Sequence, residues 1–195
     1  MSTSLDDVKR LRESTGASMM AVKKALDEAN GDTEKAVDIL RKKGEAKAAE
    51  KADRATGQGV VCTYIHSNKK IGAMIQLACE TDFVAKNEQF IELASDLAMQ
   101  VAATNPKAVS PEEIDGDFIN KEREIWIAQL ANEGKPEDKM GMILDNKEKK
   151  TREEMSLMKQ SFIKEPEKTV EALVLEMMTK MGENIKVVRF VRFDV

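Results

Sequence analysis

The most constraining feature of this sequence is an alternating stretch that ends abruptly in a polar corner. Residues 71–80 alternate between two sets of side chains, in the order Ile-Gly-Ala-Met-Ile-Gln-Leu-Ala-Cys-Glu. A period of two predicts a β-strand with one face toward a core. The alternation stops at Thr81-Asp82, which can cap a helix, and Phe83-Val84 follows at once. The sequence therefore predicts a strand-to-helix corner with an acid and an aromatic ring side by side.

Two interpretations of this corner are open. A corner that is held from behind would point Asp82 and Phe83 outward as a wedge, because an acid and an apolar ring then reach a shared target together. The alternative is an ordinary capped helix with Phe83 turned into the core. The tetrapeptide alone fits both, so the rest of the chain has to decide.

Composition and charge exclude several classes of protein. The chain has 195 residues, of which 34% are charged and 42% hydrophobic, and this balance is typical of a well-solvated globular protein. A net charge of −4 argues against a protein that works mainly by coating nucleic acid. No apolar run approaches the length needed to cross a bilayer, and the first residues lack the basic and apolar regions of an export signal. We therefore expect a cytoplasmic protein.

Two cysteines, Cys62 and Cys79, lie in predicted strands without CxxC spacing. They indicate small buried thiols in a reducing compartment, and a disulfide between neighbouring strands is the alternative.

Residues 1–55 are predicted to form a domain of three short helices. Residues suited to cap these helices are Ser4, Ser18 and Asp32, and glycines suited to end them are Gly16, Gly31 and Gly44. The pattern matches a bundle of the ubiquitin-associated type, which buries little surface and usually serves to bind a partner. Residues 45–54, rich in Ala, Lys and Glu, are expected to form a helical linker at its end.

Residues 56–195 are predicted to form an α+β core domain. Strands are expected at residues 60–66, 70–80 and 183–195, and helices at 87–103, 114–131, 136–158 and 169–181. This order predicts a three-stranded antiparallel sheet packed against helices on one side.

The last predicted strand carries apolar residues at both phases. Ile185, Val187, Val191 and Phe193 share one phase, and Val188 and Phe190 lie on the other. A solvent-exposed sheet face is normally polar. We therefore expect a homodimer, with Val188 and Phe190 in its interface.

Chemistry-bearing clusters are scarce. His66 is the only histidine, so one chain cannot assemble a histidine triad or a multi-histidine metal site. The lysine-rich segment Lys147–Lys150 could contact RNA by its charge. No aromatic residues are interleaved with it to stack on bases, so the sequence does not support RNA binding there. We expect no covalent catalysis, no cofactor and no metal.

Several segments, in order, give the chain a resemblance to bacterial elongation factor Ts. They are residues 8–26, 28–32, 46–49, 80–86 and 160–170, and the central match is Glu-Thr-Asp-Phe-Val-Ala-Lys at 80–86. The first segment departs from the family at Ala21-Val22, where Asp-Cys is frequent, and this change hardly alters a helix.

The resemblance implies a guanine nucleotide exchange factor for elongation factor Tu. It assigns Thr81, Asp82, Phe83 and Val84 to the disturbance of the partner's Mg²⁺ and phosphate site. It assigns Arg12, Met19 and Met20 to a grip on the G domain, although either methionine could instead belong to the bundle core. No direct contact with nucleic acid or membrane is implied.

Longer family members have two related halves and a coiled-coil insertion, whereas this sequence has one sheet-bearing core. Dimerisation would recover the second half. The rival interpretations are an adaptor of the ubiquitin-associated type and an RNA-binding accessory protein of translation. The specific corner segment argues against the adaptor, and the net charge argues against RNA binding.

Overall fold

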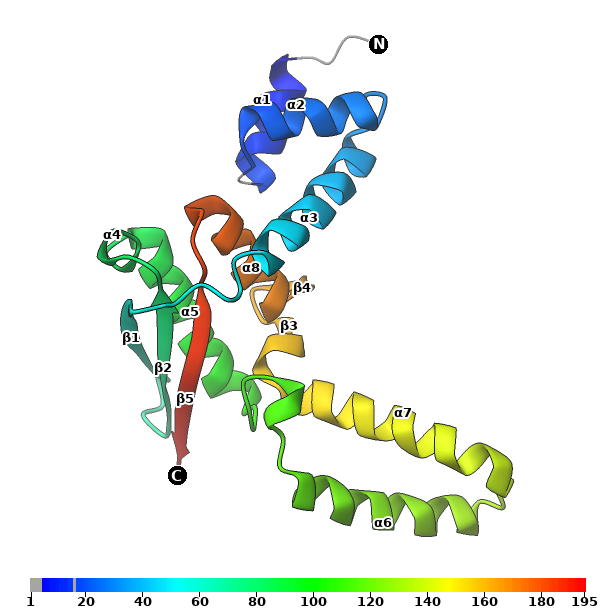
Figure 1. Cartoon of the computed structure of the whole chain (residues 1–195). Coiled ribbons are helices and arrows are strands. Elements are labelled where there is room, and N and C mark those ends of the chain that lie inside the picture. The colour runs from blue at the N-terminus through cyan, green and yellow to red at the C-terminus, as the bar shows by residue number, and fades with distance from the viewer. Residues whose placement is uncertain (1–4, 16) are drawn as a thin grey trace. The chain divides into compact units, whose positions relative to one another are not determined.

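The computed structural model describes residues 5–15 and 17–195, and it confirms the α+β class (Figure 1). The helices are α1 (Leu5–Thr15), α2 (Met19–Glu28), α3 (Thr33–Ala49), α4 (Asp82–Ala85), α5 (Glu88–Thr104), α6 (Gly116–Asn132), α7 (Glu137–Met155) and α8 (Val170–Met181). The strands are β1 (Gln58–Ile65), β2 (Ile71–Cys79), β3 (Ser161–Phe162), β4 (Glu165–Thr169) and β5 (Lys186–Asp194).

Contacts divide the chain into two compact units. The first contains the residues up to 62 together with 76–94 and 172–187, and the second contains 63–75, 95–171 and 188–195. The domain boundary that the sequence predicts after residue 55 stays a prediction.

The N-terminal helices α1, α2 and α3 enclose a small apolar core in the first unit. The core consists of Val8, Leu11, Ala17, Val22, Ala25, Leu26, Ala29, Ala36 and Leu40. Ser18 caps α2 by accepting a hydrogen bond from the Ala21 amide at 3.2 Å, and Asp32 accepts from the amides of Glu34 and Lys35 at 3.1 Å each. These two caps are as predicted, whereas Ser4 and Gly16 lie outside the described residues.

The third helix does not end at Gly44 as expected, because α3 continues to Ala49 and absorbs much of the predicted linker. Gly44 has a different use. A Cβ atom at this position would lie 3.3 Å from Oγ1 of Thr179 in α8, so glycine allows the two helices to approach closely. A packing contact thus outweighs the poor helix propensity of glycine.

The three-stranded antiparallel sheet has the order β1-β2-β5, and α5 lies against one of its faces. Cys62 of β1 lies 4.0 Å, measured from Sγ, from the carbonyl oxygen of Ile91 in α5. At the other edge, Arg192 of β5 donates from Nε to the carbonyl oxygen of Ala102 at 3.0 Å. Ile75 and Leu77 of the central strand are fully buried, as the alternating pattern predicts.

The two ends of β5 are buried differently. Arg192, near the end of the strand, contacts the backbone of α5, whereas near its start Val187 is 3% and Val188 41% exposed. The sheet face opposite α5 is the apolar one that solvent reaches, and a shallow hollow on it is lined by Thr63, Ile65, Gly72, Met74 and Phe193. Val188 is exposed and Phe190 is partly buried, and their assignment to a dimer interface stays a prediction.

A small antiparallel hairpin, β3-β4, was not predicted from the sequence. It is tied to α5 by Gln100, which is fully buried. Nε2 of Gln100 donates to the carbonyl oxygen of Ser161 at 3.1 Å, and its Oε1 accepts from the amide of Ile163 at 2.9 Å. Phe162 between them is buried in the second unit.

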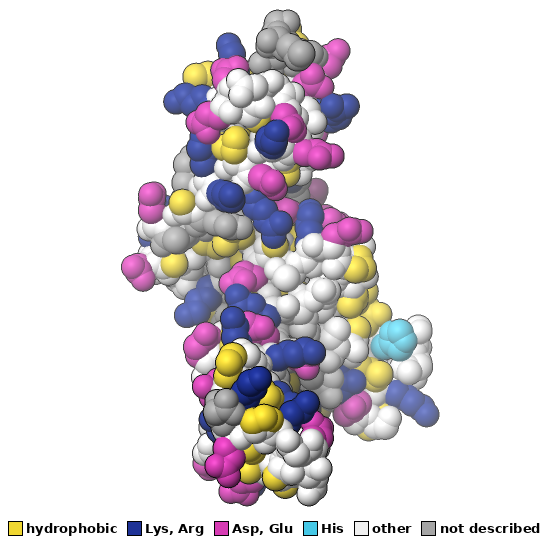
Figure 2. Space-filling model, turned by 90° about the vertical axis from the view of Figure 1, so that its right-hand side faces the viewer, with side chains coloured by type: hydrophobic (Ala, Val, Ile, Leu, Met, Phe, Trp, Pro, Cys, Tyr) yellow, Lys and Arg dark blue, Asp and Glu magenta, His cyan; other side chains and the backbone are white. Residues whose placement is uncertain are grey.

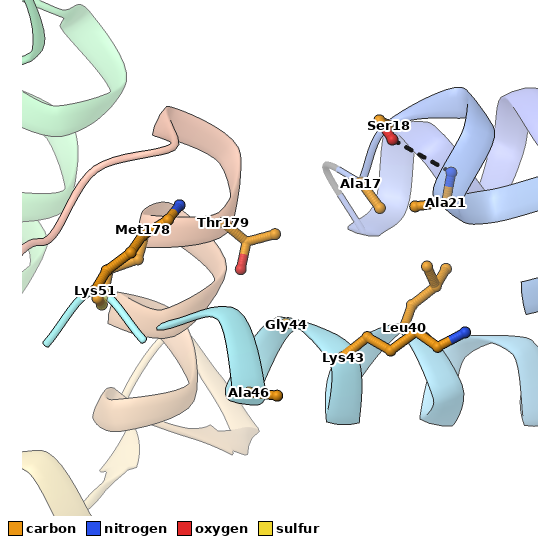
Figure 3. A pocket seen from close by; sticks show the side chains of 10 residues that line it. All are labelled: Ala17, Ser18, Ala21, Leu40, Lys43, Gly44, Ala46, Lys51, Met178 and Thr179. Carbon is orange, nitrogen blue, oxygen red and sulfur yellow. Dashed lines mark hydrogen bonds between the residues drawn. The ribbon is translucent and has the colours of Figure 1, made fainter. Parts of the chain in front are cut away.

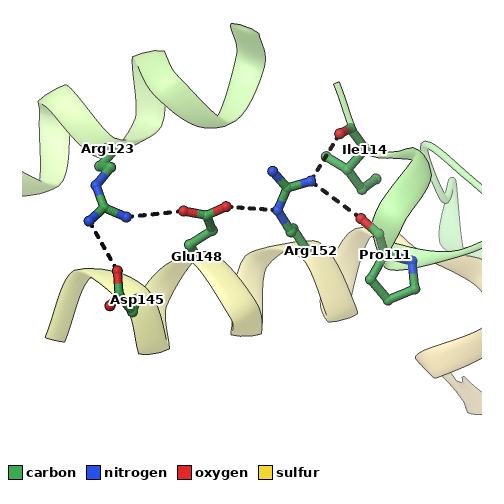
Figure 4. A network of polar contacts seen from close by, with 6 residues as sticks. All are labelled: Pro111, Ile114, Arg123, Asp145, Glu148 and Arg152. Atoms are coloured by element: carbon green, nitrogen blue, oxygen red, sulfur yellow. Dashed lines mark hydrogen bonds and ion pairs between the residues drawn. The ribbon is translucent and has the colours of Figure 1, made fainter. Parts of the chain in front are cut away.

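Helices α6 and α7 form an antiparallel pair around Trp126, Leu130 and Leu144. Figure 4 shows the polar contacts at the base of this pair. Arg123 of α6 reaches Asp145 at 3.0 Å and Glu148 at 3.1 Å on α7. Arg152 pairs with Glu148 at 2.9 Å and donates to the carbonyl oxygens at 111 and 114. The partly exposed network aligns the two helices more than it stabilises them.

Candidate functional site

The predicted corner exists, and Thr81 forms its hinge. Thr81 has extended backbone angles and is the N-cap of α4, where its hydroxyl oxygen accepts from the Val84 amide at 3.5 Å. The strand β2 ends two residues earlier, at Cys79. The chain therefore turns directly from the central strand of the sheet into a single helical turn.

Phe83 points away from the protein, and its side chain is 82% exposed. Its neighbours Val84 and Ala85 are each only 9% exposed. Successive residues of a helix point about 100° apart, so one turn can bury Val84 while it presents Phe83. The core placement of Phe83 is thereby excluded. Val84 anchors α4 to the protein, while Asp82 and Phe83 stay exposed to solvent.

Asp82 is an ionised acid at the start of the same turn. Its carboxylate pairs with Lys86 at 2.7 Å, and the Asp82 side chain remains 51% exposed. The hydrogen bond from Lys86, followed by the charge of this lysine, lowers the pKa of Asp82 below its ordinary value of 3.8. The corner thus presents a negative charge beside an apolar ring at neutral pH.

Glu183 supports the corner from behind, and sequence reasoning missed it. Its Oε2 accepts from the amides of Glu80 and Thr81 at 3.1 and 3.0 Å, and its Oε1 accepts from the Thr81 hydroxyl at 2.6 Å. Glu183 lies in the turn between α8 and β5, far along the chain from the corner. No local pattern could have indicated this contact.

The next residue, Asn184, continues the network. Its amide donates to Oε1 of Glu80 at 2.6 Å, and its side-chain Nδ2 donates to the carbonyl oxygens of Ala52 and Arg54 at 3.1 and 2.9 Å. Asn184 is 5% exposed, so these bonds are made in a largely dry environment.

The two cysteines are free thiols. Cys79 is buried next to the corner, and its Sγ donates to the carbonyl oxygen of Thr81 at 3.2 Å. Burial, followed by the negative charge of Glu183, raises the pKa of Cys79 above its ordinary 9.0, so the thiol stays neutral. The predicted interpretation as small buried thiols holds for Cys79, whereas Cys62 is only partly buried.

The second set of predicted site residues lies on the helical bundle. Arg12 is exposed, and Met19 and Met20 are 46% and 68% exposed. Neither methionine therefore belongs to the bundle core. All three side chains are available to a partner, as the proposed grip requires.

A hollow of about 400 Å³ also lies in the first unit, next to the bundle (Figure 3). Its described lining is mostly small or apolar and includes Ala17, Leu40 and Met178. Lys43, which also lines it, is already paired with Glu28 at 2.7 Å. We assign no ligand to this hollow.

Groups suited to catalysis or to metal binding are not assembled at the corner. His66 lies at the β1-β2 turn, with its Nδ1 3.1 Å from the Tyr64 hydroxyl. Across residues 5–15 and 17–195, no cluster of three or more His, Cys, Asp or Glu could hold a metal ion. None of the described helices is both long and apolar enough to cross a membrane.

Comparison with known proteins identifies the family of this chain. The family model described as "Elongation factor TS" matches residues 6–195. The elongation factor Ts of Thermosipho melanesiensis is 52% identical over 188 residues, which cover 96% of each chain. The elongation factor Ts of Oleidesulfovibrio alaskensis is 53% identical, and the alignment covers 96% of this chain and 95% of the relative. A match of this extent includes both the bundle and the corner, and on this evidence the chain belongs to the elongation factor Ts family.

Proposed function

We propose that this chain, a translation elongation factor by its family, is a guanine nucleotide exchange factor. It binds elongation factor Tu·GDP and promotes GDP release, so that GTP can rebind. The observation that carries the proposal is the exposed Phe83 beside the ionised Asp82, on a corner that is supported from behind.

The reaction needs no covalent chemistry, because the work is done by binding. A protein that binds the nucleotide-free partner more tightly than the nucleotide-bound partner must weaken nucleotide binding by the same factor. A coupling free energy of about 3 kcal/mol corresponds to a change in affinity of roughly 150-fold. We therefore describe the chain as a binding protein with no cofactor or metal of its own.

Asp82 and Phe83 have complementary roles in this proposal. Burial of the Phe83 ring in a pocket of the partner supplies roughly 1.5–3 kcal/mol. The Asp82 carboxylate enters with it and disturbs the site at which the partner holds Mg²⁺ and the phosphates of GDP. The bundle binds the same G domain through Arg12, Met19 and Met20. This second contact positions the corner at the Mg²⁺ and phosphate site.

The chain is also proposed to act as a homodimer through the outer face of its sheet. Ile65, Met74, Val191 and Phe193 are exposed on strands of this face, and Phe193 is 71% exposed. A sheet face that meets water is normally polar. A second copy of this chain offers the same apolar face, so a two-fold contact would cover both.

Translation elongation places the protein in the cytoplasm, and the proposal includes no direct contact with nucleic acid or membrane. The net charge is −4. Figure 2 shows Lys and Arg side chains interspersed with Asp and Glu over the face drawn, with no broad basic surface on it. Nucleic-acid binding draws most of its affinity from such basic surfaces.

Phe83→Ala tests the proposal. The wild-type chain should accelerate release of fluorescent GDP from elongation factor Tu in a stopped-flow assay. The rate that Phe83→Ala catalyses should be about tenfold or more lower than the wild-type rate, because the ring supplies binding energy. The melting temperature should change little, since Phe83 makes few internal contacts. Met142→Ala, which truncates another exposed apolar side chain in α7, is the matched control and should exchange at the wild-type rate. Normal exchange by Phe83→Ala would refute the wedge.

A further inference from the structure

We infer that Glu183 is a positioning residue for nucleotide exchange: its carboxylate holds the strand-to-helix corner so that Asp82 and Phe83 meet the partner in one orientation. The inference rests on the proposed function and adds to it a residue from a distant part of the sequence.

The turn that carries Phe83 cannot hold itself in place. Helix α4 has only four residues, Asp82–Ala85, and a helix this short is unstable without tertiary support. Its cap is weak, because the Thr81 hydroxyl lies 3.5 Å from the Val84 amide. The ring of Phe83 is 82% exposed and gains little support from packing. An aromatic wedge needs a defined direction, so the rigidity has to come from elsewhere.

Glu183 provides this rigidity through three hydrogen bonds to two consecutive residues. It accepts from the amides of Glu80 and Thr81 and from the Thr81 hydroxyl, at 3.1, 3.0 and 2.6 Å. Hydrogen bonds to a carboxylate are stronger than those between neutral groups. They fix both the backbone direction at the end of β2 and the rotamer of the capping side chain, which together set the direction of α4.

The end of β2 and the turn before β5 bond to each other in both directions, and substitutions can remove these bonds separately. The side chain of Glu80 accepts from the Asn184 amide at 2.6 Å, while that of Glu183 accepts from the Glu80 amide. The Asn184 side chain, by contrast, donates to the carbonyl oxygens of Ala52 and Arg54, before β1. Truncation of Glu183 therefore removes the acceptor of three bonds from the corner, whereas truncation of Asn184 removes two buried hydrogen bonds and keeps the three bonds to Glu183 in place.

The experiment compares Glu183→Ala with Asn184→Ala in the full chain. Release of fluorescent GDP from elongation factor Tu is measured against the concentration of exchange factor, which separates the saturating rate from the half-saturating concentration. Glu183→Ala should lower the saturating rate about tenfold, because the amides of Glu80 and Thr81 and the Thr81 hydroxyl all lose their acceptor and no longer fix the corner. Asn184→Ala should lower the melting temperature at least as much and keep a saturating rate close to wild type.

Two further readouts separate positioning from general stability. Amide hydrogen exchange should become faster at Glu80 and Thr81 in Glu183→Ala and stay slow there in Asn184→Ala. Glu183→Gln should recover most of the saturating rate, because its amide oxygen accepts from both backbone amides and its amide nitrogen can donate to the Thr81 hydroxyl. A Glu183→Gln variant as slow as Glu183→Ala would mean that charge matters and not position, and it would overturn the inference.

A wild-type saturating rate in folded Glu183→Ala would also overturn it, as would equal losses in Glu183→Ala and Asn184→Ala. If Glu183→Ala does not fold, Glu183→Asp replaces it, because a carboxylate on a side chain one methylene shorter cannot keep all three hydrogen bonds to the corner. An unchanged rate in that variant would count against the inference in the same way. A wild-type chain that leaves GDP release unaffected would refute the proposed function, and this inference with it.

Discussion

At the scale of single residues, the corner assigns opposite tasks to neighbouring side chains. Phe83 is presented to solvent, Val84 is buried beneath it, and Asp82 carries a charge that Lys86 partly balances. An ion pair between exposed side chains adds little stability. The pair also lowers the pKa of Asp82 further below its ordinary value of 3.8.

Lys86→Met tests the origin of the low pKa of Asp82. The hydrogen bond and charge of Lys86 lower this pKa from its ordinary 3.8, so removal of Lys86 should raise it toward that value. A carboxyl group whose pKa is lowered by folding stabilises the protein above its ordinary pKa, and this contribution is lost as the pH falls through the lowered value. Exchange activity should therefore show no titration of Asp82 above about pH 5.

Carbon-13 NMR titration of the carboxyl groups measures this change directly. Asp194, whose pKa is lowered by its hydrogen bond with Arg192, is the internal control and should titrate identically in both proteins. An Asp82 titration that Lys86→Met leaves unchanged would show that the pair does not set the pKa.

The same scale shows what the sequence could predict about the site. Thr81, Asp82 and Phe83 were predicted at a strand-to-helix corner because alternation and capping are local patterns, and the exposure of Phe83 is confirmed. Glu183 could not be predicted, since its partners at 80 and 81 are about a hundred residues away in sequence. Its role follows only from tertiary structure.

At the scale of elements, the bundle shows how a small core leaves side chains free for binding. Leu11 and Val22 are buried in the bundle core, while Arg12, Met19 and Met20 next to them in sequence are exposed. Methionine adapts its shape to a partner's surface. Three short helices thus bury enough apolar surface to fold and still display a contact surface.

Replacement of Arg12, Met19 and Met20 by Ala together should weaken exchange and leave the fold intact. Because these side chains are exposed, the melting temperature should shift little, as is usual for surface substitutions. The half-saturating concentration in the GDP-release assay should rise about tenfold or more, since two apolar contacts and one charged contact are lost. Val22→Ala, in the bundle core, is the contrast and should lower the melting temperature. Wild-type exchange by the folded triple variant would refute the grip.

Element prediction failed where tertiary contacts override local propensity. Gly44 was expected to end a helix but lies within α3, close to Thr179. The strand β4 contains Pro166 and has no apolar alternation, so nothing local indicated it, and buried Gln100 holds the hairpin instead. In β5 both phases are apolar, so the sequence could not show that Arg192 would bond to the backbone of α5 at Ala102.

At the scale of the whole molecule, the outer face of the sheet remains to be explained. Met74 and Ile65 lie on neighbouring strands, and Phe193 lines the same shallow hollow. The side chain of Ile65 lies over Gly72, where a Cβ atom would be only 2.7 Å from its Cδ1. Glycine at this position therefore leaves room for the Ile65 side chain to lie across the sheet.

Phe193→Asp tests whether a second copy covers this face. If Phe193 is buried between two copies, the substitution places an unpaired charge in the contact, which is strongly unfavourable. Light scattering should then report a dimer for the wild-type chain and a monomer for the variant at micromolar concentration. Met142→Asp is the matched control, since Met142 is an exposed apolar side chain in α7, outside the sheet. It should leave the dimer intact. A wild-type monomer, or a dimer that Phe193→Asp does not weaken, would refute the dimer but leave the exchange function standing, because the corner and the bundle belong to each copy separately.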